Sequence, residues 1–168
     1  MNGPARIEVR PAGTGDWRLM RRIQSSGRLF ASDGFHPVGT PGVPGQIQWL
    51  VALAGRQPVG FCAWGSSLGA AEIRWMGTLG DDALAAGSAL CEAVACLAGR
   101  ESNRLTVTYP AGPGEADFWG RLGFVPNSSG SVAREDVGLI VAEKRLAWPG
   151  RPGLRSGSPH RERPAPLP

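Results

Sequence analysis

Residues 118–126 read FWGRLGFVP, and this stretch says most about the fold. It predicts a short helix over 115–122 that is followed directly by a strand starting at Phe124. Upstream, the β-branched run LTVTY at 105–109 predicts a central strand, and the prolines and glycine that follow it force a break. Downstream, residues 138–146 predict a last strand.

Toward the N-terminus, the residues preceding this block predict a strand over 71–79 and a helix over 82–98. The helix begins beside two acids and stops at Gly99, as helix-end chemistry requires. Strand alternation places two side chains on one side (Ile73, Trp75) and three on the other (Glu72, Arg74, Met76). Gly77 predicts a bulge or a splay within the strand.

The first third of the chain predicts a strand, a helix and a hairpin. A short strand ends at Pro11, and a helix capped by Asp16 carries apolar residues at helical spacing from Trp17 onward. Two strand-like runs at 47–54 and 59–64 are joined by the turn residues Gly-Arg-Gln-Pro. Between the helix and the hairpin, residues 31–46 are rich in glycine and proline and predict an irregular loop.

The charge of the chain is concentrated in its C-terminal tail. The formal net charge is +4, and residues 149–168 carry four arginines against one acid, so +3 belongs to the tail. This tail also holds six prolines and predicts a disordered segment after a single domain at 1–148. A nearly neutral domain argues against nucleic-acid binding by the folded part, although the tail itself leaves that possibility open.

The compartment expected is a reduced cytoplasm. Three cysteines without paired spacing and a start without an apolar signal core favour it. The alanine-rich segment at 83–99 is too weakly hydrophobic to predict a membrane span. No cluster of histidine, cysteine and acid predicts a metal site.

The order of these elements favours an α+β fold, a sheet layered with helices. In this order the chain resembles the GNAT N-acetyltransferase family, and the resemblance implies a mixed and mostly antiparallel sheet with helices on both faces. Four passages carry the resemblance: IEVRPAGTGDW, WLVALAGRQPVGFCAW, AGSALCEAVACLA and FWGRLGFVP. The last is the most specific, because Phe118, Leu122, Gly123 and Phe124 match a short aromatic helix followed by Leu-Gly-Phe.

The resemblance implies an acyltransferase that moves an acetyl or acyl group from acyl-CoA, with acetyl-CoA as co-substrate, to the amine of a small molecule or peptide. It implies a splayed strand that pairs with the pantetheine arm and a helix start that holds the pyrophosphate, which suits free amides and the helix dipole. The residues so implicated are Met76, Gly77, Thr78, Leu79, Ala85, Ala86, Gly87, Ser88 and Trp119. An acceptor region is expected at Phe30, Phe35, His36 and Trp64, and the chain is expected to be a monomer or homodimer.

Several positions depart from the family pattern. Asp82 or its neighbour stands where an arginine or glutamine contacts the pyrophosphate, and of the usual glycines Gly87 alone remains. Trp119 stands where a tyrosine protonates the leaving thiolate, and indole cannot give up a proton near neutral pH. Gly112 stands in place of an asparagine. The acids have a second interpretation, in which they cap the helix.

Two residues remain as catalytic candidates, each with a structural alternative. Glu72 could accept the amine proton through water, or could pair with Arg74 on the sheet surface. Tyr109, the single tyrosine, could replace the missing acid or could be packed. The tryptophans are core residues by default, although Trp64, Trp75 and Trp119 could line an apolar cleft. The competing function is a GNAT-fold protein that has lost acetyl-CoA chemistry and serves as a ligand-binding module, a partner subunit or a repurposed catalyst.

Overall fold

The computed structural model describes residues 6–26, 28–29, 47–67, 69–99, 102–127 and 138–147. Its elements, in chain order, are β1 (Ile7–Pro11), the 3-10 turn η1 (Thr14–Asp16), α1 (Trp17–Ser26), β2 (Arg28–Leu29), β3 (Gln48–Ala54), β4 (Gln57–Ser67), β5 (Ala70–Thr78), α2 (Ala83–Ala98), β6 (Arg104–Pro110), α3 (Pro113–Arg121), β7 (Val125–Pro126) and β8 (Leu139–Arg145). The predicted tail at 149–168 lies outside the described residues, so the domain boundary stays a prediction.

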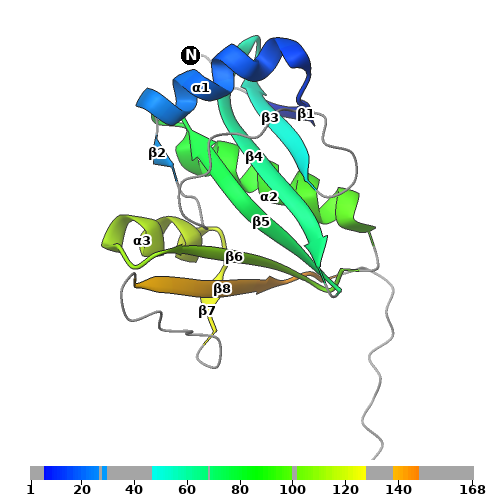
Figure 1. The fold of residues 1–168 in the computed structure, drawn as a ribbon, viewed down its shortest axis with the longest axis vertical. Coiled ribbons are helices and arrows are strands. Elements are labelled where there is room, and N and C mark those ends of the chain that lie inside the picture. The colour runs from blue at the N-terminus through cyan, green and yellow to red at the C-terminus, as the bar shows by residue number, and fades with distance from the viewer. Residues whose placement is uncertain are drawn as a thin grey trace, which may run out of the picture.

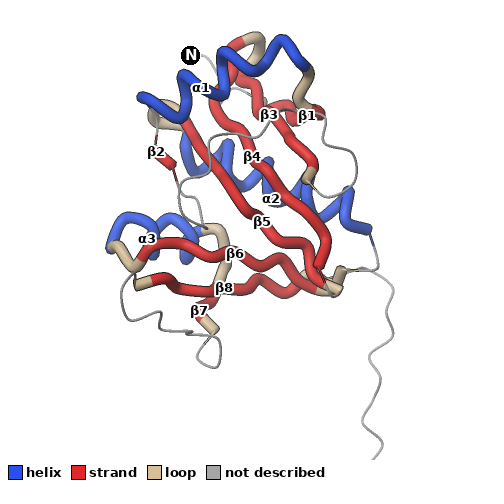
Figure 2. The backbone as a smooth tube through the Cα atoms, in the orientation of Figure 1, coloured by secondary structure: helices blue, strands red, loops and turns tan. Residues whose placement is uncertain are grey.

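One sheet organises the described residues, in the order β1-β3-β4-β5-β6-β8-β7, with β2 beside β5. The pair β5–β6 is parallel and the other pairs are antiparallel. Helix α1 covers one face and α2 the other, as Figures 1 and 2 show. The predicted α+β class, a mostly antiparallel sheet with helices on both faces, is confirmed.

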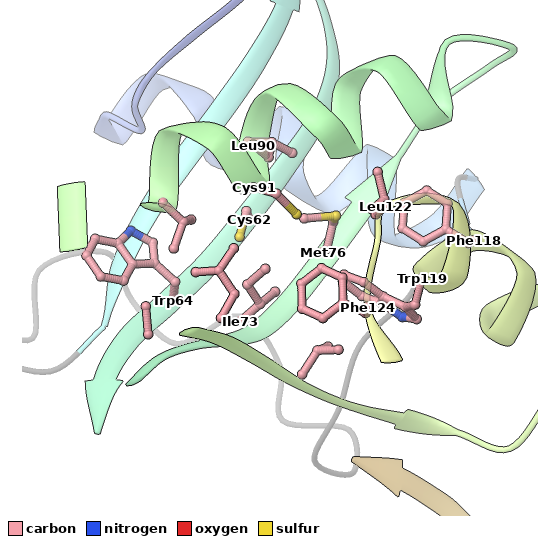
Figure 3. Packing of buried hydrophobic residues seen from close by; sticks show 14 of the residues in the cluster. Cys62, Trp64, Ile73, Met76, Leu90, Cys91, Phe118, Trp119, Leu122 and Phe124 are labelled. Carbon is pink, nitrogen blue, oxygen red and sulfur yellow. The ribbon is translucent and has the colours of Figure 1, made fainter. Parts of the chain in front are cut away.

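Two apolar clusters hold the helices to the sheet. The larger one joins α2 and α3 to the sheet and contains Leu90, Val94, Phe118 and Trp119. Figure 3 shows its packed side chains. The smaller one joins α1 to the other face through Met20, Ile23 and Phe61. The apolar positions of α1 recur at helical spacing and therefore point into this cluster, while its arginines remain exposed.

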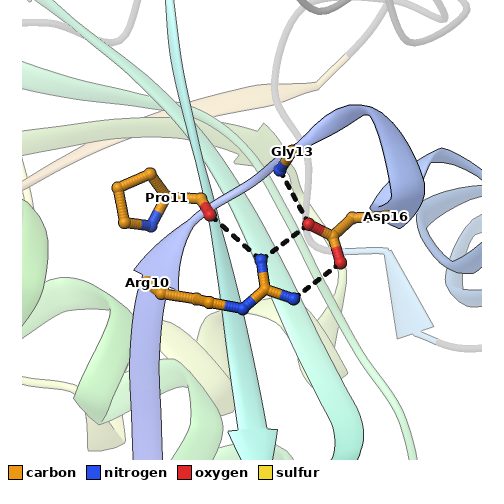
Figure 4. A network of polar contacts seen from close by, with 4 residues as sticks. All are labelled: Arg10, Pro11, Gly13 and Asp16. Atoms are coloured by element: carbon orange, nitrogen blue, oxygen red, sulfur yellow. Dashed lines mark hydrogen bonds and ion pairs between the residues drawn. The ribbon is translucent and has the colours of Figure 1, made fainter.

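Asp16 does not cap α1 by itself, which corrects the sequence prediction. It ends the 3-10 turn, and its carboxylate accepts two hydrogen bonds from the Arg10 guanidinium, at 2.7 and 2.8 Å. The same carboxylate accepts the Gly13 backbone N–H at 2.7 Å, and Arg10 also donates to the carbonyl of Pro11 (Figure 4). The hydrogen bonds and charge of Arg10 lower the pKa of Asp16, although its partial burial opposes that shift. This network fixes the turn from β1 into α1.

A bulge in β5 overturns the predicted alternation of that strand. Ala63 of β4 pairs with Trp75, and the next residue, Trp64, pairs with Ile73, so Arg74 is an extra residue in β5. The extra residue shifts the strand by one position, because strand side chains alternate with a period of two. Ile73 and Met76 therefore share the α2 cluster, and Trp75 lies in the α1 cluster.

Candidate functional site

The central feature of the site is the separation of β5 from β6. The two strands pair from Ala71↔Leu105 to Ile73↔Val107, although β5 continues to Thr78 and β6 to Pro110. Beyond that point β6 stays paired with β8 as far as Leu139. Figure 1 shows the two strands diverging toward α3 on one side and α1 on the other.

The bulge accounts for where the strands part. Arg74 follows the last β5–β6 pair directly, and a bulge bends its strand and increases the local twist. The splay was predicted from the sequence, but at Gly77. Glycine there has a different role, because a Cβ atom would lie 2.6 Å from Cε1 of Phe61 and 3.0 Å from Cγ2 of Ile23. Gly77 allows the close packing of β4 and α1 against this strand.

Helix α2 begins just after β5 ends. Its N-cap residue, Asp82, makes no capping hydrogen bond through its side chain, so a cap by the Asp82 carboxylate is not formed. The first intrahelical bond runs from the Ala86 N–H to the Asp82 carbonyl at 2.8 Å. Asp81 and Asp82 are both exposed. The backbone N–H groups of the first turn are therefore not bonded by the Asp82 side chain, but two carboxylates lie beside them.

The residues predicted to follow this helix start face different ways. Ala85 is exposed, whereas Ala86 and Gly87 are buried. A Cβ atom at Gly87 would lie 2.8 Å from Cζ of Phe118, so glycine here lets α3 pack against α2. Ser88 donates to Glu92 at 3.2 Å. Of the predicted pyrophosphate residues, Ala85 is the one whose side chain is exposed at the start of the helix.

Tyr109 and Trp119 form one aromatic group beside the splay. Tyr109 lies two residues beyond the last β5–β6 pair, and its ring stacks on Trp119 with centroids 6.2 Å apart. Trp119 also meets Phe118 and Phe124 edge to face, and it is fully buried. Burial raises the pKa of Tyr109 above the ordinary value of a phenol, which is itself protonated at neutral pH. The pair thus places a proton donor next to a residue that cannot donate one.

Glu72 lies on β5 before the strands part, opposite Thr106 of β6. Its Oε2 is 3.4 Å from Nε of Arg74, and its side chain is 28 % exposed. The predicted surface pair therefore forms. The carboxylate still reaches solvent, as a base acting through water requires.

The end of β5 carries the other predicted residues. Met76 and Thr78 are buried on the α2 side, and Leu79 is half-buried in the α1 cluster. The Leu79 N–H donates to the carbonyl of Val59 at 2.8 Å, which ties the end of β5 to β4. At this end of β5, a ligand would therefore meet the backbone edge of the strand.

Of the predicted acceptor residues, Trp64 is the one that the structure describes. Trp64 is 2 % exposed and lies at the opposite end of the large cluster from Trp119 (Figure 3), which fits a core residue. Phe30, Phe35 and His36 lie outside the described residues. Glu115, which the sequence analysis missed, folds back against Gly112 at the start of α3. A glutamate three residues after the N-cap glycine is the sequence pattern that predicts such a contact.

Two further findings concern the described ranges alone. No three histidine, cysteine or acidic side chains there gather as metal ligands. None of the three helices combines the length and apolar character needed to cross a bilayer.

Comparison with solved structures identifies the fold. An acetyltransferase ascribed to the GNAT family from Desulfovibrio desulfuricans superposes with a TM-score of 0.60 at 16 % identity, covering 84 % of this chain and 100 % of that one. A protein named as a streptothricin acetyltransferase from Bacillus anthracis, in complex with acetyl coenzyme A, gives 0.61 at 16 % identity over 85 % and 99 %. The ribosomal-protein-S18-alanine N-acetyltransferase of Escherichia coli gives 0.61 at 15 % identity over 88 % and 98 %.

Comparison by sequence found no relative. No protein-family model matches the chain, and no curated protein matches it. At these identities the structural likeness establishes the architecture. The chain has the GNAT acetyltransferase fold.

Proposed function

We propose that the chain is an acyl-CoA-dependent N-acyltransferase that transfers an acetyl or related acyl group to a primary amine of a small molecule or protein. The observation that carries the proposal is the separation of β5 from β6 after Ile73. Past that point, no described strand pairs with Trp75 and Met76 on the β6 side of β5. Backbone groups of this kind need partners, and an extended amide-containing ligand such as pantetheine supplies them.

The chemistry proposed is direct attack. The amine nitrogen forms a bond to the thioester carbonyl carbon, the carbon–sulfur bond breaks, and the thiolate takes up a proton. Backbone N–H groups at the open edge of β5 stabilise the developing oxyanion. Glu72 accepts the amine proton through water, and Tyr109, whose hydroxyl is protonated at neutral pH, supplies the proton to sulfur. Trp119 packs behind Tyr109 and holds its ring.

The pyrophosphate site is the weakest part of the proposed machinery. The first turn of α2 supplies amides and a favourable dipole, but Asp81 and Asp82 stand beside it. Two like charges about 6 Å apart repel by about 1–3 kcal/mol at surface-like dielectric. This repulsion supports the second candidate, a GNAT-fold protein without acetyl-CoA chemistry that binds another ligand or partner.

Titration calorimetry with acetyl-CoA and with free CoA decides between the two. Asp82→Arg should tighten CoA binding by about tenfold at low salt, and added salt should shrink the gain. Glu8→Arg is the matched control, because it makes the same charge change on edge strand β1, three positions from β5 in the sheet. Absence of binding for both ligands at millimolar concentration, in the parent and in a variant whose strand β2 is disrupted, would reject the acyltransferase and leave the second candidate.

Turnover tests the two catalytic residues. If binding is found, Glu72→Gln and Tyr109→Phe should each lower kcat by about 10²-fold or more, the usual contribution of general acid–base catalysis. Full turnover in Glu72→Gln would eliminate this residue as the base. The same outcome in Tyr109→Phe would assign the tyrosine to packing against Trp119.

A further inference from the structure

The short strand β2 lies on the edge of β5 that the proposed function requires. It pairs antiparallel through Arg28↔Thr78 and Leu29↔Gly77. Strand β4 already occupies the other edge of these same two residues, through Phe61↔Gly77 and Gly60↔Thr78. β2 is therefore on the edge that β6 uses farther back. Figure 2 shows it beside the end of β5, where β6 has turned away.

The open edge is consequently short. β6 covers 71–73 and β2 covers 77–78, so three residues remain, and the first of them is the bulged Arg74. A bulged residue is left out of regular ladder bonding. Two residues, Trp75 and Met76, are then left in regular register. An extended pantetheine arm that runs toward the start of α2 needs the backbone of Gly77 and Thr78 as well.

At this end of β5 the side chain of Thr78 is buried, but its hydroxyl group lacks a hydrogen bond within the described part of the chain. Thr78 is 1 % exposed, and its hydroxyl has no hydrogen-bond partner among the described residues. Strand alternation puts it on the α2 side with Met76, next to Gly60 of β4. A buried hydroxyl without a partner is destabilising, and such groups are uncommon in native proteins.

We propose that β2 is an internal strand that occupies the acyl-CoA edge of β5 and leaves it when acyl-CoA binds. The inference rests on the proposed function. β2 is suited to displacement because an antiparallel pair of two residues contains one hydrogen-bonded register and therefore at most about two backbone bonds. The pairing lowers the apparent affinity for CoA by the fraction of molecules in which the edge is free.

The test compares two double variants with the parent by calorimetry with free CoA. Arg28→Pro with Leu29→Pro removes both backbone N–H groups of β2, and so disrupts the pairing whichever residue is hydrogen-bonded. Arg28→Ala with Leu29→Ala is the matched control, because it keeps both N–H groups. The proline pair should bind CoA about tenfold more tightly, and the alanine pair within about twofold of the parent.

The outcomes separate this inference from the proposed function. Equal affinity in the parent and the proline pair would overturn the displacement and leave the acyltransferase standing. Absence of binding in all three proteins would reject the acyltransferase itself. Binding by the proline pair alone would support both the displacement of β2 and the proposed acyltransferase function, and would mean that β2 prevents CoA binding in the parent.

Hydrogen exchange on the parent protein gives an answer that does not depend on how the variants fold. Saturating CoA should remove protection from whichever amide of 28–29 bonds to β5, while the amides of 77–78 stay protected, because the ligand replaces β2 as the partner of β5. Unchanged protection at 28–29 in the saturated complex would refute displacement.

Discussion

Replacing Gly77 with alanine adds one methyl group at the tightest approach of β4, β5 and α1. The new Cβ atom would lie 2.6 Å from Cε1 of Phe61 and 3.0 Å from Cγ2 of Ile23. Both neighbours are fully buried. Carbon atoms in contact prefer about 3.5–4.0 Å, so the Phe61 ring would have to move by about 1 Å inside a packed cluster.

The expected cost follows from two opposing effects. Overpacking of a core costs about 1–3 kcal/mol, and the smaller conformational freedom of alanine in the unfolded chain returns about 0.4–1 kcal/mol. The variant should therefore lose about 1–2 kcal/mol. For a chain of this length each kcal/mol lowers Tm by about 2–4 °C, which predicts a decrease of about 2–8 °C.

Urea and thermal unfolding of Gly77→Ala measure this loss. Gly120→Ala in α3 is the matched control, because a Cβ atom there meets nothing within 4 Å and alanine favours a helix. It should leave stability unchanged or raise it by up to about 1 kcal/mol. If Gly77→Ala is as stable as the parent, the close packing of Phe61 against position 77 does not require glycine there, and that explanation is wrong.

Two more predictions concern groups whose pKa the fold shifts. Asp16→Asn should cost about 1 kcal/mol at pH 7 by breaking the Arg10 network, and the difference from the parent should vanish as pH falls from about 4 through the lowered pKa of Asp16, since a depressed carboxyl stabilises the fold only while ionised. Acid unfolding of both proteins measures this; a pH-independent difference would contradict it. Ellman's reagent at pH 8 should titrate Cys96 at once, because it is exposed, but neither Cys62 nor Cys91, whose pKa burial raises, in the latter case to about 12. Three rapidly reacting thiols in the native protein would refute the buried placement.

Features that depend on neighbouring residues along the chain could be predicted from the sequence. Helix α2 was expected to end at Gly99 and does, because the terminating signal is local. The strands at 105–109 and 138–146 and the helix at 115–122 agree with β6, β8 and α3 to within two residues. The order of these elements favoured an α+β sheet layered with helices, and the resemblance to the GNAT family implied the mostly antiparallel sheet with helices on both faces.

Tertiary structure decided the features in which two distant segments meet. The bulge at Arg74 is a mismatch between β4 and β5, so no pattern within β5 reveals it, and it places Ile73 on the same face as Met76, opposite Trp75. β2 is two residues long, too short for any periodicity, and exists only through its pairing with Gly77 and Thr78. Local signals specify how a segment folds, whereas register and close approach are properties of pairs. For that reason the sequence alone could predict this fold, and only the tertiary structure showed that β2 covers the end of the strand proposed to bind acyl-CoA.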